Sequence, residues 1–461
     1  MRAIIFNDKL MLQGQRVLIS KTRIAALRFV WPTTVGHRLL VFRLVATAWP
    51  RIAPLAAWYR RWIIPRTCII AVVGSLGKTT TRRMTAAALG GRVPRESFDN
   101  FSPWVALAML RVRPWHKEAL MEVGISTPGE MGPIADFLRP DVVVVTSIRH
   151  SEHNRTLPTL EATRIAKADM VRALPPGGTA ILNGDDPHVM WMATQTNARI
   201  IKFGMGPNNE VRATDVRIDG TMGTRFTLHA GGTAREVRIN LLGKHLVYAA
   251  LAAVAVALLR GRTLDEAVTL LQAVDPAPHR MRPLQLPGGI TVIGDDFKSP
   301  LETIFAALDT FAAIPARRHV VVLGNIEHPP GPQGPLYKEL GRRLSPWADR
   351  VLLIGSNRLR SVIAGAGAVG MDRSNFTYAG SSIDGTIALL RRELKKGDVV
   401  LVKGTGSQRL ERVILALQGR NVRCPIKTCH LNSAVRCAEC PVLEGGSAAF
   451  ANRFVQKMVG L

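Results

Sequence analysis

Acidic residues are scarce in this sequence, which carries 34 Asp and Glu against 61 Lys and Arg and a formal net charge of +27. A positive net charge of this size creates an electrostatic field that attracts polyanions such as nucleic acid, anionic lipid or phosphorylated substrates. The arginines are spread along the whole chain, so a generally basic proteome explains the charge equally well. Because no recognition motif accompanies the charge, we expect no specific nucleic-acid partner.

Long apolar runs are also missing. No uncharged run reaches the ~18–20 residues that span a bilayer, and the first ten residues lack a signal-peptide pattern, so we expect a cytoplasmic protein. Residues 38–66 nevertheless alternate apolar patches with arginine and tryptophan. Such a segment either lies at the inner face of the membrane as a peripheral contact or packs as a basic arm on the protein. Pro50, Pro54 and Pro65 predict that it is cut into short pieces rather than forming one long helix.

Cysteine is the third scarce residue, with five in 461. Cys68 stands alone in an apolar run and is expected in the core, whereas the other four crowd together near the end of the chain as Cys424, Cys429, Cys437 and Cys440. Inside a cell a disulfide is not expected, and four thiolates can bind Zn²⁺ tetrahedrally. Free thiols and an iron–sulfur cluster are the alternatives, and His430 is a possible substitute ligand.

Most of the chain alternates short β-branched runs with helix-period segments, which predicts an α/β fold. "TCIIAVVG", "EALMEVG", "DVVVVTSI", "GTAILNG" and "ARIIKFG" predict a mostly parallel sheet, and residues 211–242 alternate with period two, which predicts an appended antiparallel meander. "HLVYAALAAVAVALLRG" predicts an apolar helix. After a Pro-rich break, "GITVIGDD", "RHVVVLGN", "DRVLLIG" and "GDVVLVKG" predict the strands of a second, smaller Rossmann-like α/β domain.

These patterns divide the chain into four segments. We expect a basic apolar arm at residues 1–65 and an ATP-binding central domain at residues 66–275. A C-terminal α/β domain is expected at residues 276–420, followed by a Cys-rich tail at residues 421–461.

The stretch "AVVGSLGKTTTRRM" places a glycine-containing turn between a strand and a helix. The strict P-loop pattern fails because Val72 occupies the position of its first glycine, but the shorter form Gly-x-x-Gly-Lys-Thr remains. Its glycines let backbone N–H groups face phosphate oxygens at a helix N-terminus. Lys78 can then reach the terminal phosphates and Thr79 can hold Mg²⁺. The residues expected to bind the nucleotide are Gly74, Gly77, Lys78, Thr79 and Thr80.

Nine segments, in order along residues 68–418, resemble the Mur ligases, the ATP-dependent amide-forming enzymes of peptidoglycan synthesis and their relatives. They are "VVGSLGKTTT", "MEVGISTPGEM", "VVTSIRHSEH", "TRIAKADMVRAL", "AILNGDDP", "LLGKHLVYAALAA", "PHRMRPLQLPGGITVIGDD", "VVVLGNIE" and "GDVVLVKGTGSQRLERV". The resemblance implies a ligase that phosphorylates a carboxylate with ATP and Mg²⁺ and transfers the acyl group to an amine. The implied partners are a UDP-muramoyl peptide, or another envelope precursor, and an amino acid or dipeptide.

The resemblance also implies roles for residues of the central segment. Glu122 matches a Mg²⁺ ligand of the family, and His153 matches a histidine that binds a second Mg²⁺, with His150 as a rival for that role. Lys167 matches a lysine that is carbamylated in the family. A carbamate reverses the charge of lysine and is an oxygen ligand suited to Mg²⁺. With Lys78, residues Lys167 and His153 form the expected catalytic set.

Residues of the second segment are implied to act on the same nucleotide. Arg280 matches an arginine that contacts ATP phosphates from across the cleft, Asp295 matches an acid near the ribose, and Lys403 matches a loop near the substrate. Two segments meeting on one nucleotide imply a cleft that closes and excludes water from the acyl phosphate.

The sequence departs from the family at several positions. Leu246 and Ala249 replace two asparagines after His245, so an amide that could pair with adenine is missing, and Asn325 stands where an acid is common. Residues 1–65 show no counterpart of the family's UDP-sugar-binding domain. An alternative function is therefore a P-loop ATPase or nucleotide-binding, membrane-associated partner that no longer ligates.

Overall fold

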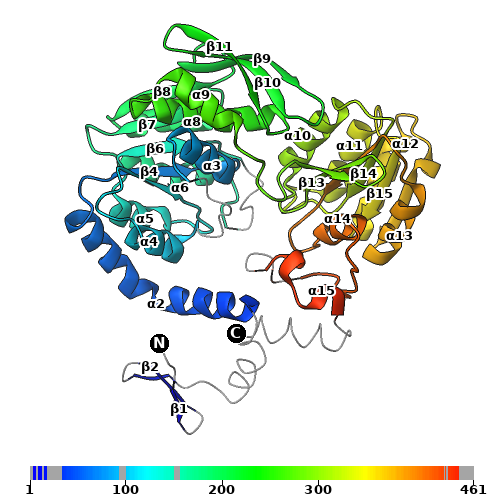
Figure 1. Ribbon diagram of the computed structural model, residues 1–461, viewed down its shortest axis with the longest axis horizontal. Helices are drawn as coiled ribbons and strands as arrows, with labels where there is room; N and C mark the ends of the chain where they lie inside the picture. The colour runs from blue at the N-terminus through cyan, green and yellow to red at the C-terminus, as the bar shows by residue number, and fades with distance from the viewer. Residues whose placement is uncertain are drawn as a thin grey trace.

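The computed structural model contains two α/β units side by side, with the N-terminal helix α2 and the cysteine-rich tail along their lower side in the view of Figure 1. The two sheets, the larger of which is mostly parallel, confirm the predicted fold class. The residues that the structure describes are 4–6, 9–12, 15–17, 34–92, 100–149, 156–429, 431 and 435–445.

The larger sheet has eight strands in the order β11-β10-β9-β8-β7-β6-β4-β5. The five apolar runs predicted as buried strands pair in parallel, because each is rich in residues that fit a sheet covered on both faces. They are β4 (Cys68–Val73), β5 (Glu118–Glu122), β6 (Val142–Val145), β7 (Thr179–Asn183) and β8 (Arg199–Gly204). The antiparallel meander is also confirmed, as β9 (Val211–Ile218), β10 (Thr224–Ala230) and β11 (Thr233–Ile239).

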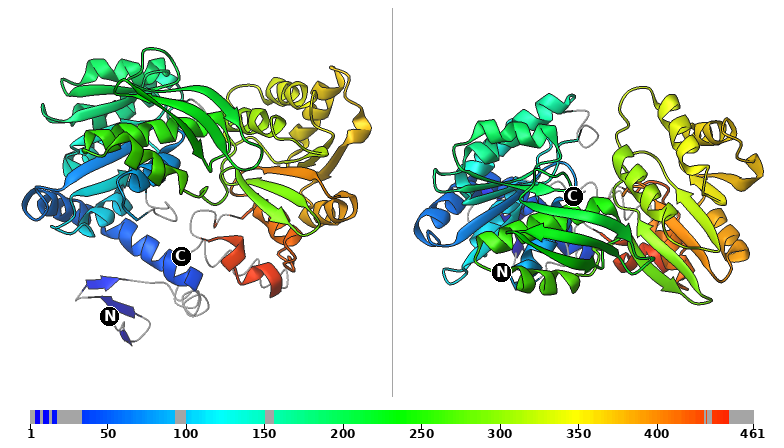
Figure 2. Two further views of the ribbon diagram at one scale, coloured as in Figure 1. Left: turned by 45° about the horizontal axis from the view of Figure 1, so that its top comes forward. Right: turned by 90° about the horizontal axis from the view of Figure 1, so that it is seen from above.

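Helices cover both faces of this sheet (Figure 2). Alternate residues of β4 face opposite sides: Val72 belongs to the core cluster with α3 and α8, whereas Val73 belongs to the cluster with α4 and α5. The helices of this unit are α3 (Lys78–Ala88), α4 (Ser102–Leu110), α5 (Met131–Leu138), α6 (Leu160–Arg172), α7 (Pro187–Met190), η1 (Trp191–Gln195), α8 (Lys244–Leu259) and α9 (Leu264–Gln272). The helix predicted around residue 250 is thus confirmed as α8.

The smaller sheet has six strands in the order β12-β13-β17-β14-β15-β16. The strands that the sequence predicted for this unit are confirmed as β13 (Ile290–Asp295), β14 (Arg318–Leu323), β15 (Arg350–Ile354) and β17 (Asp398–Lys403). The sequence patterns missed the two edge strands β12 (Arg282–Leu286) and β16 (Phe376–Gly380). Edge strands are partly exposed and need no continuous apolar run, so their sequences resemble loops.

Helices α10 to α14 and two short 3₁₀ helices pack on this sheet, and the tail adds two short turns. Their bounds are α10 (Leu301–Ala312), α11 (Gln333–Leu344), η2 (Asn357–Leu359), α12 (Arg360–Gly367), η3 (Arg373–Asn375), α13 (Ile383–Glu393), α14 (Glu411–Leu417), η4 (Cys437–Glu439) and α15 (Val442–Gly445). Phe311 of α10 shares a hydrophobic cluster with Val247 of α8, so one continuous core joins the two units.

The N-terminal segment contains a small antiparallel sheet and one long helix. The strands are β1 (Ile4–Phe6), β2 (Lys9–Leu12) and β3 (Gln15–Val17). The prediction that prolines cut this segment into short pieces was wrong, because Pro50 and Pro54 lie inside the 29-residue helix α2 (Thr34–Trp62). Figure 1 shows that α2 changes direction along its length, and its second half packs against α4 and α5. Prolines inside a helix bend it and remove backbone hydrogen bonds, and the packing on α4 and α5 compensates for this loss.

Candidate active site

The loop that the sequence predicts to bind phosphate, here called the phosphate-binding loop, joins β4 to α3 at the carboxyl edge of the larger sheet, where parallel α/β sheets bind their ligands. Gly74 has φ of 136°, and a Cβ atom there would lie 2.1 Å from Thr146 Oγ1. Gly77 has φ of 86° and is the N-cap of α3. Both positions therefore require glycine, and the backbone N–H groups at the start of α3 are available to an anion.

Two lysines converge on this loop from different helices. Lys78 Nζ donates to Gly74 O (2.8 Å) and Ser75 O (3.0 Å). Lys167 Nζ of α6 donates to the same Gly74 O (2.8 Å) and to Ser75 Oγ (3.2 Å). The Lys78 and Lys167 side chains are buried. The loop thus gathers positive charge at the place where the sequence predicts phosphate.

An oxygen-rich group lies beside the first turn of α3. Thr79 Oγ1 donates to Glu122 Oε1 (3.0 Å), and Asn100 Nδ2 donates to the same oxygen (3.1 Å). Arg82 Nε lies 3.9 Å from Glu122 Oε2, and the Glu122 side chain is buried at the end of β5. A hydroxyl and a carboxylate are donors that Mg²⁺ prefers, so these two residues fit the predicted metal ligands. Thr80, the next residue of the helix, is buried.

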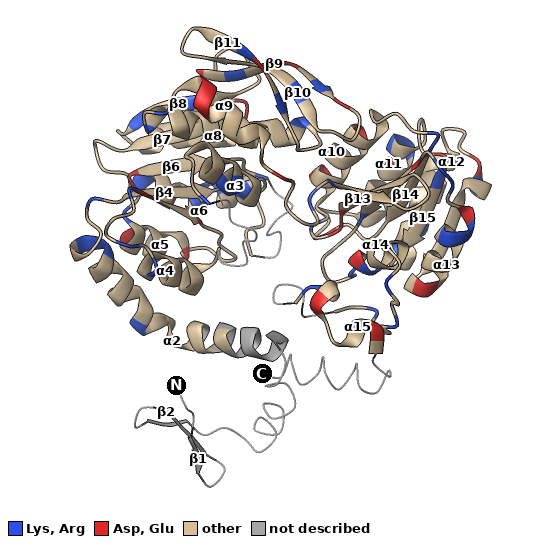
Figure 3. Cartoon of the chain, in the orientation of Figure 1, with Lys and Arg blue, Asp and Glu red and all other residues tan. Residues whose placement is uncertain are grey.

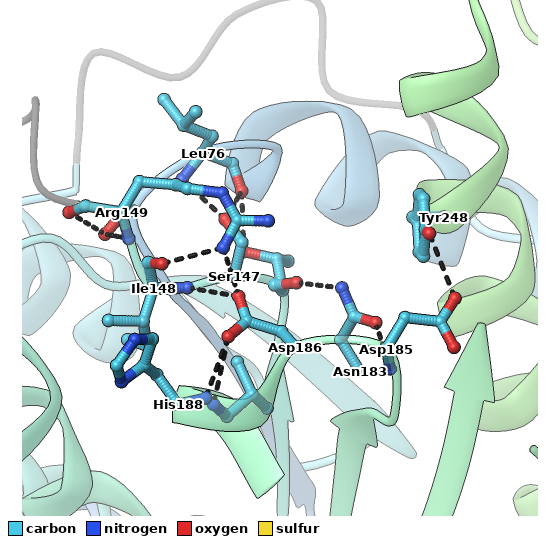
Figure 4. Close-up of polar contacts among 12 residues, drawn as sticks. Leu76, Ser147, Ile148, Arg149, Asn183, Asp185, Asp186, His188 and Tyr248 are labelled. Atoms are coloured by element: carbon cyan, nitrogen blue, oxygen red, sulfur yellow. Dashed lines mark hydrogen bonds and ion pairs between the residues drawn. The ribbon is translucent and has the colours of Figure 1, made fainter. Parts of the chain in front are cut away.

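The predicted metal ligand His153 and its rival His150 lie outside the described residues. The residue before them, Arg149, forms an ion pair with Asp186 (2.5 Å). Asp186 also accepts from Ile148 N (2.9 Å) and caps α7, as Figure 4 shows. Asp186 therefore ties the end of the β6 segment to the β7–α7 turn.

Sequence reasoning assigned no role to this β7–α7 turn, although "AILNGDDP" is one of the family segments. Asn183 Nδ2 donates to Thr146 O (2.8 Å), next to the phosphate-binding loop. Asp185 accepts from Met205 N, Gly206 N and Asn209 Nδ2, and from the Tyr248 hydroxyl at 2.9 Å (Figure 4). Burial opposes the charge on Asp185, but these hydrogen bonds hold its pKa below the ordinary value. The turn is thus fastened to both the loop and α8.

Helix α8 carries the residues that replace the family's asparagines. Leu246 and Ala249 are buried in the core, whereas Tyr248 is half-buried and points toward Asp185. Burial, followed by the charge on Asp185, raises the pKa of Tyr248. The phenol therefore stays protonated at neutral pH and acts as a hydrogen-bond donor to Asp185.

The predicted residues of the second unit form a separate cluster at the ends of β13 and β17. Lys403 Nζ lies 2.6 Å from Asp295 Oδ2 and also donates to Lys298 O (2.8 Å) and Thr303 Oγ1 (3.1 Å). The Lys403 and Asp295 side chains are buried, and burial lowers the pKa of Lys403. Lys403, which was predicted to lie near the substrate, and Asp295, which was predicted to lie near the ribose, thus form an ion pair with each other.

Arg280 and its neighbours extend this second cluster. The Arg280 guanidinium lies over the Phe297 ring, 4.8 Å from its centroid. His279 Nδ1 lies 3.0 Å from Asp296 Oδ1, and its Nε2 lies 3.7 Å from Glu411 Oε1. Burial opposes the charge on His279, but the two carboxylates raise its pKa. His279 therefore links the loop before β12 to the start of α14.

The four tail cysteines line one cavity together with Arg409 and Arg412. Within the ranges that the structure describes, no three His, Cys, Asp or Glu side chains are arranged to hold a single metal ion. His430 lies outside these ranges. The expected Zn²⁺ stays a prediction. Cys68 is partly buried in β4 against the core, as expected.

The second half of α2 is anchored to the larger sheet. Arg60 is buried and donates to the backbone oxygens of Ile64, Thr67, Leu138 and Arg139 and to Asp141. The opposite face exposes Leu55, Trp58 and Trp62. No helix within the described part of the chain combines the length and the hydropathy needed to cross a bilayer.

Comparison with known proteins decides the family. The Mur ligase middle-domain model matches residues 72–257, and the model of the Mur ligase glutamate ligase domain matches residues 279–406. The chain belongs to the Mur ligase family. It is therefore an ATP-dependent carbon–nitrogen ligase, and the alternative of an ATPase that no longer ligates is not favoured.

Two related sequences have the same stated activity. The UDP-N-acetylmuramoyl-tripeptide–D-alanyl-D-alanine ligase of Mycobacterium bovis is 32% identical over 377 residues, covering 76% of this chain and 72% of the relative. The enzyme of that name from Escherichia coli is 28% identical over 374 residues and 79% of each chain. Both matches extend over most of the Mur ligase described here.

Solved structures share the fold. MurF from Acinetobacter baumannii superposes with a TM-score of 0.70 at 23% identity over 80% of each chain. The MurF ligase of Thermotoga maritima, solved in complex with ADP, has a TM-score of 0.68 at 18% identity and covers 81% of this chain and 84% of its own.

Proposed function

We propose that this Mur ligase joins D-alanyl-D-alanine to a UDP-N-acetylmuramoyl tripeptide in peptidoglycan synthesis. The stated activity of the relatives from M. bovis and E. coli supports these substrates. ATP first phosphorylates the terminal carboxylate of the tripeptide, which gives an acyl phosphate and ADP. The dipeptide amine then attacks the acyl carbon, forms the amide and releases phosphate. The reaction would take place in the cytoplasm, where ATP is available.

The observation that carries the proposal is the convergence of Lys78, Lys167, Thr79 and Glu122 on the Gly74–Thr79 loop. In the proposal, the β- and γ-phosphates bind to the backbone N–H groups at the start of α3, because Ser75 N and Leu76 N of the loop already donate to Ser147. The Lys78 ammonium leaves its two carbonyl partners and neutralises charge that develops on the transferred phosphoryl group. Gly74, Gly77 and Thr80 belong to the same phosphate-binding segment.

Magnesium and a carbamate complete the proposed phosphate site. Thr79 and Glu122 would hold Mg²⁺, which neutralises phosphate charge when it is bound. Lys167 lies beside the loop, where carbamylation of its ammonium would replace a positive group with an oxygen ligand. His153 is proposed as a further Mg²⁺ ligand.

The second unit is proposed to close over the nucleotide. Arg280 would approach the ATP phosphates, Asp295 the ribose and Lys403 the substrate, while closure excludes water from the acyl phosphate. The proposed domains are residues 66–275 and 276–420, flanked by the arm at 1–65 and the tail at 421–461. The predicted Zn²⁺ is not carried into this proposal, because no arrangement for a single ion is found among the described residues.

Phosphate release tests the proposed reaction. With ATP and Mg²⁺, we expect release only when UDP-N-acetylmuramoyl tripeptide and D-alanyl-D-alanine are both present, with the pentapeptide as the product seen by mass spectrometry. Single omissions of either substrate are the controls. Release that depends on a different carboxylate or amine would replace the proposed substrates, and release that is indifferent to both would contradict ligation.

Membrane contact through residues 38–66 forms a separate part of the proposal. Leu55, Trp58 and Trp62 are exposed on α2, and the guanidinium of the exposed Arg61 lies over the Trp62 ring, a combination of apolar, aromatic and basic side chains that is typical of interfacial helices. We expect the protein to sediment with anionic vesicles, and a Trp58→Ser/Trp62→Ser variant to sediment at least several-fold less. Met222→Ser, which removes an exposed apolar side chain of the β9–β10 turn, is the matched control. Equal sedimentation of all three proteins would contradict the contact.

A further inference from the structure

The loop that carries Arg280 has an unusual backbone. His279 and Met281, the residues on either side of Arg280, have φ of 60° and 45°. Neither is a glycine, and left-handed backbone costs free energy in residues that carry a Cβ atom. Such conformations persist only where the surrounding structure holds them, and they cluster at functional sites. The contacts of this loop therefore have to hold it in place.

Contacts on both sides of Arg280 do so. Arg280 N donates to Ala277 O (3.2 Å), and Met281 N donates to Asp295 Oδ1 (3.3 Å). The Met281 side chain is buried, and the Arg280 guanidinium lies over the Phe297 ring, 4.8 Å from its centroid. These contacts fix the loop after Arg280, so the His279 ring is left to fix it on the other side.

The His279 ring lies between two buried carboxylates from different elements. Its Nδ1 lies 3.0 Å from Asp296 Oδ1, just after β13, and its Nε2 lies 3.7 Å from Glu411 Oε1, in the first turn of α14. No lysine or arginine in the described part of the chain forms an ion pair with either carboxylate. A neutral imidazole has one N–H group, whereas an imidazolium has two and attracts both carboxylates. The surroundings of the ring thus favour its protonated form.

We propose that His279 is a positioning residue for the ligase reaction, because its imidazolium between Asp296 and Glu411 holds the strained loop and aims Arg280 at the nucleotide. The arrangement of these three side chains around the loop is here called the His279 clamp. The proposal rests on the proposed function, in which Arg280 approaches the ATP phosphates. Glu411 also accepts from Cys437 N (3.0 Å), so the clamp connects the tail to the same loop.

Protonation gives the clamp a pH dependence. The charged groups that act on the ring are Asp296, Glu411 and Arg280. Burial opposes the charge on the ring, but the two carboxylates raise its pKa above the ordinary 6.5, and Arg280 acts against them. Because the pKa is raised in the folded protein, the clamp is intact at low pH and is lost as the pH rises through the His279 pKa. We expect nucleotide affinity to fall over the same range.

Histidine-selective ¹³C NMR of the full-length protein tests the clamp without any turnover. The His279 signal is the one absent from both His279→Gly and His279→Asn, two substitutions that tolerate left-handed backbone. We expect this signal to titrate above 6.5. Glu411→Gln should lower its pKa by at least about half a unit, because a charge facing the ring is lost while the amide oxygen still accepts from Cys437 N. A His279 pKa at or below 6.5, or one unchanged in Glu411→Gln, would overturn the clamp.

A double-mutant cycle on nucleotide binding tests whether His279 acts through Arg280. His279→Gly should weaken the binding of a non-hydrolysable ATP analogue with Mg²⁺ at least about three-fold, although glycine relieves the backbone strain. In an Arg280→Gln protein the same change should add no further loss. The control is His116→Gly, the same substitution at an exposed histidine of the loop before β5, which should bind as the native protein does. An equal loss in both backgrounds would overturn positioning through Arg280.

The pH dependence of the same binding measurement separates the clamp from a purely structural role. Above the His279 pKa, the affinity of the native protein should approach that of His279→Gly; because ionisation of the nucleotide is common to both proteins, it cancels in the comparison. A difference between the two proteins that stays constant with pH would overturn the role of the imidazolium. If Arg280→Gln binds the analogue like the native protein, the proposed nucleotide role of Arg280 fails and the positioning role fails with it, even where NMR shows the clamp.

Discussion

Gly74 is constrained both by the local turn of the loop and by contacts from residues that are distant in the sequence. The backbone turns away from β4 there, the Thr146 hydroxyl occupies the space of a side chain, and two lysines share the carbonyl oxygen. The motif predicted the roles of Gly74 and Lys78, because their spacing is local. The contact between Lys167 and the same carbonyl joins residues 93 positions apart, so only the resemblance to a family pointed to it.

Replacement of Lys78 tests the phosphate loop. Lys78→Ala should lower ATP turnover at least about 100-fold, because it removes the cation that is proposed to neutralise the transferred phosphoryl group. Lys338→Ala, at an exposed lysine of α11, is the control. Circular dichroism should show the same fold for both variants. Turnover by Lys78→Ala equal to that of the control would rule out this loop as the active one.

His245 predicts a pH dependence of stability. Burial lowers its pKa to about 4, from an ordinary value of 6.5. The unfolded chain therefore binds the proton first, and the free energy of unfolding falls by about 1.4 kcal/mol per pH unit as the pH drops from 6.5 towards 4. Above pH 6.5 this contribution is constant. Urea unfolding of the protein and of His245→Gln at several pH values should show a shallower slope in the variant; identical slopes would contradict the assignment.

At the scale of elements, strands buried on both faces were predictable and edge elements were not. Runs such as "DVVVV" hold enough apolar residues to identify a central strand, whereas β12 and β16 do not. For α2 the sequence prediction failed in the other direction, because it excluded an element that is present. The prolines disfavour a long helix locally, but packing on α4 and α5 stabilises one. Tertiary contacts thus decided the elements whose local signals were weak or misleading.

Arg60 tests how α2 is held. Arg60→Met should lower the free energy of unfolding by about 2–3 kcal/mol, since several buried carbonyl oxygens lose their donor. Arg61→Met, at the next and exposed residue, should change it by less than about 0.5 kcal/mol. Chemical denaturation measures both values. Equal effects of the two substitutions would show that α2 is not anchored through Arg60.

At the scale of the whole molecule, two α/β units share one hydrophobic core through α8 and α10, and each carries part of the candidate site (Figure 1). Basic residues are distributed over both units rather than gathered on one element, as Figure 3 shows for the described residues. This distribution fits an enzyme that binds phosphorylated substrates in a cleft better than one large nucleic-acid surface.

Closure of the two units is testable in solution. With a non-hydrolysable ATP analogue, Mg²⁺ and the acceptor, the radius of gyration from X-ray scattering should become smaller, because both units are proposed to contact the same nucleotide. Lys78→Ala, which we expect to weaken nucleotide binding, should stay in the open state under the same conditions. Compaction of both proteins, or of neither, would contradict closure driven by the nucleotide.

The sequence by itself determined the fold class and the family and predicted the phosphate loop, because these depend on local periodicity, on short spacings and on the order of motifs. Only the tertiary structure showed that Asp295 pairs with Lys403, that Asp185 and Asp186 fasten the β7–α7 turn, and that Arg409 faces four cysteines. These contacts join segments that are far apart in the chain, so no spacing in the sequence predicts them. Burial makes these contacts important for stability, since a polar group that is removed from water costs free energy unless the fold places a hydrogen-bond partner beside it.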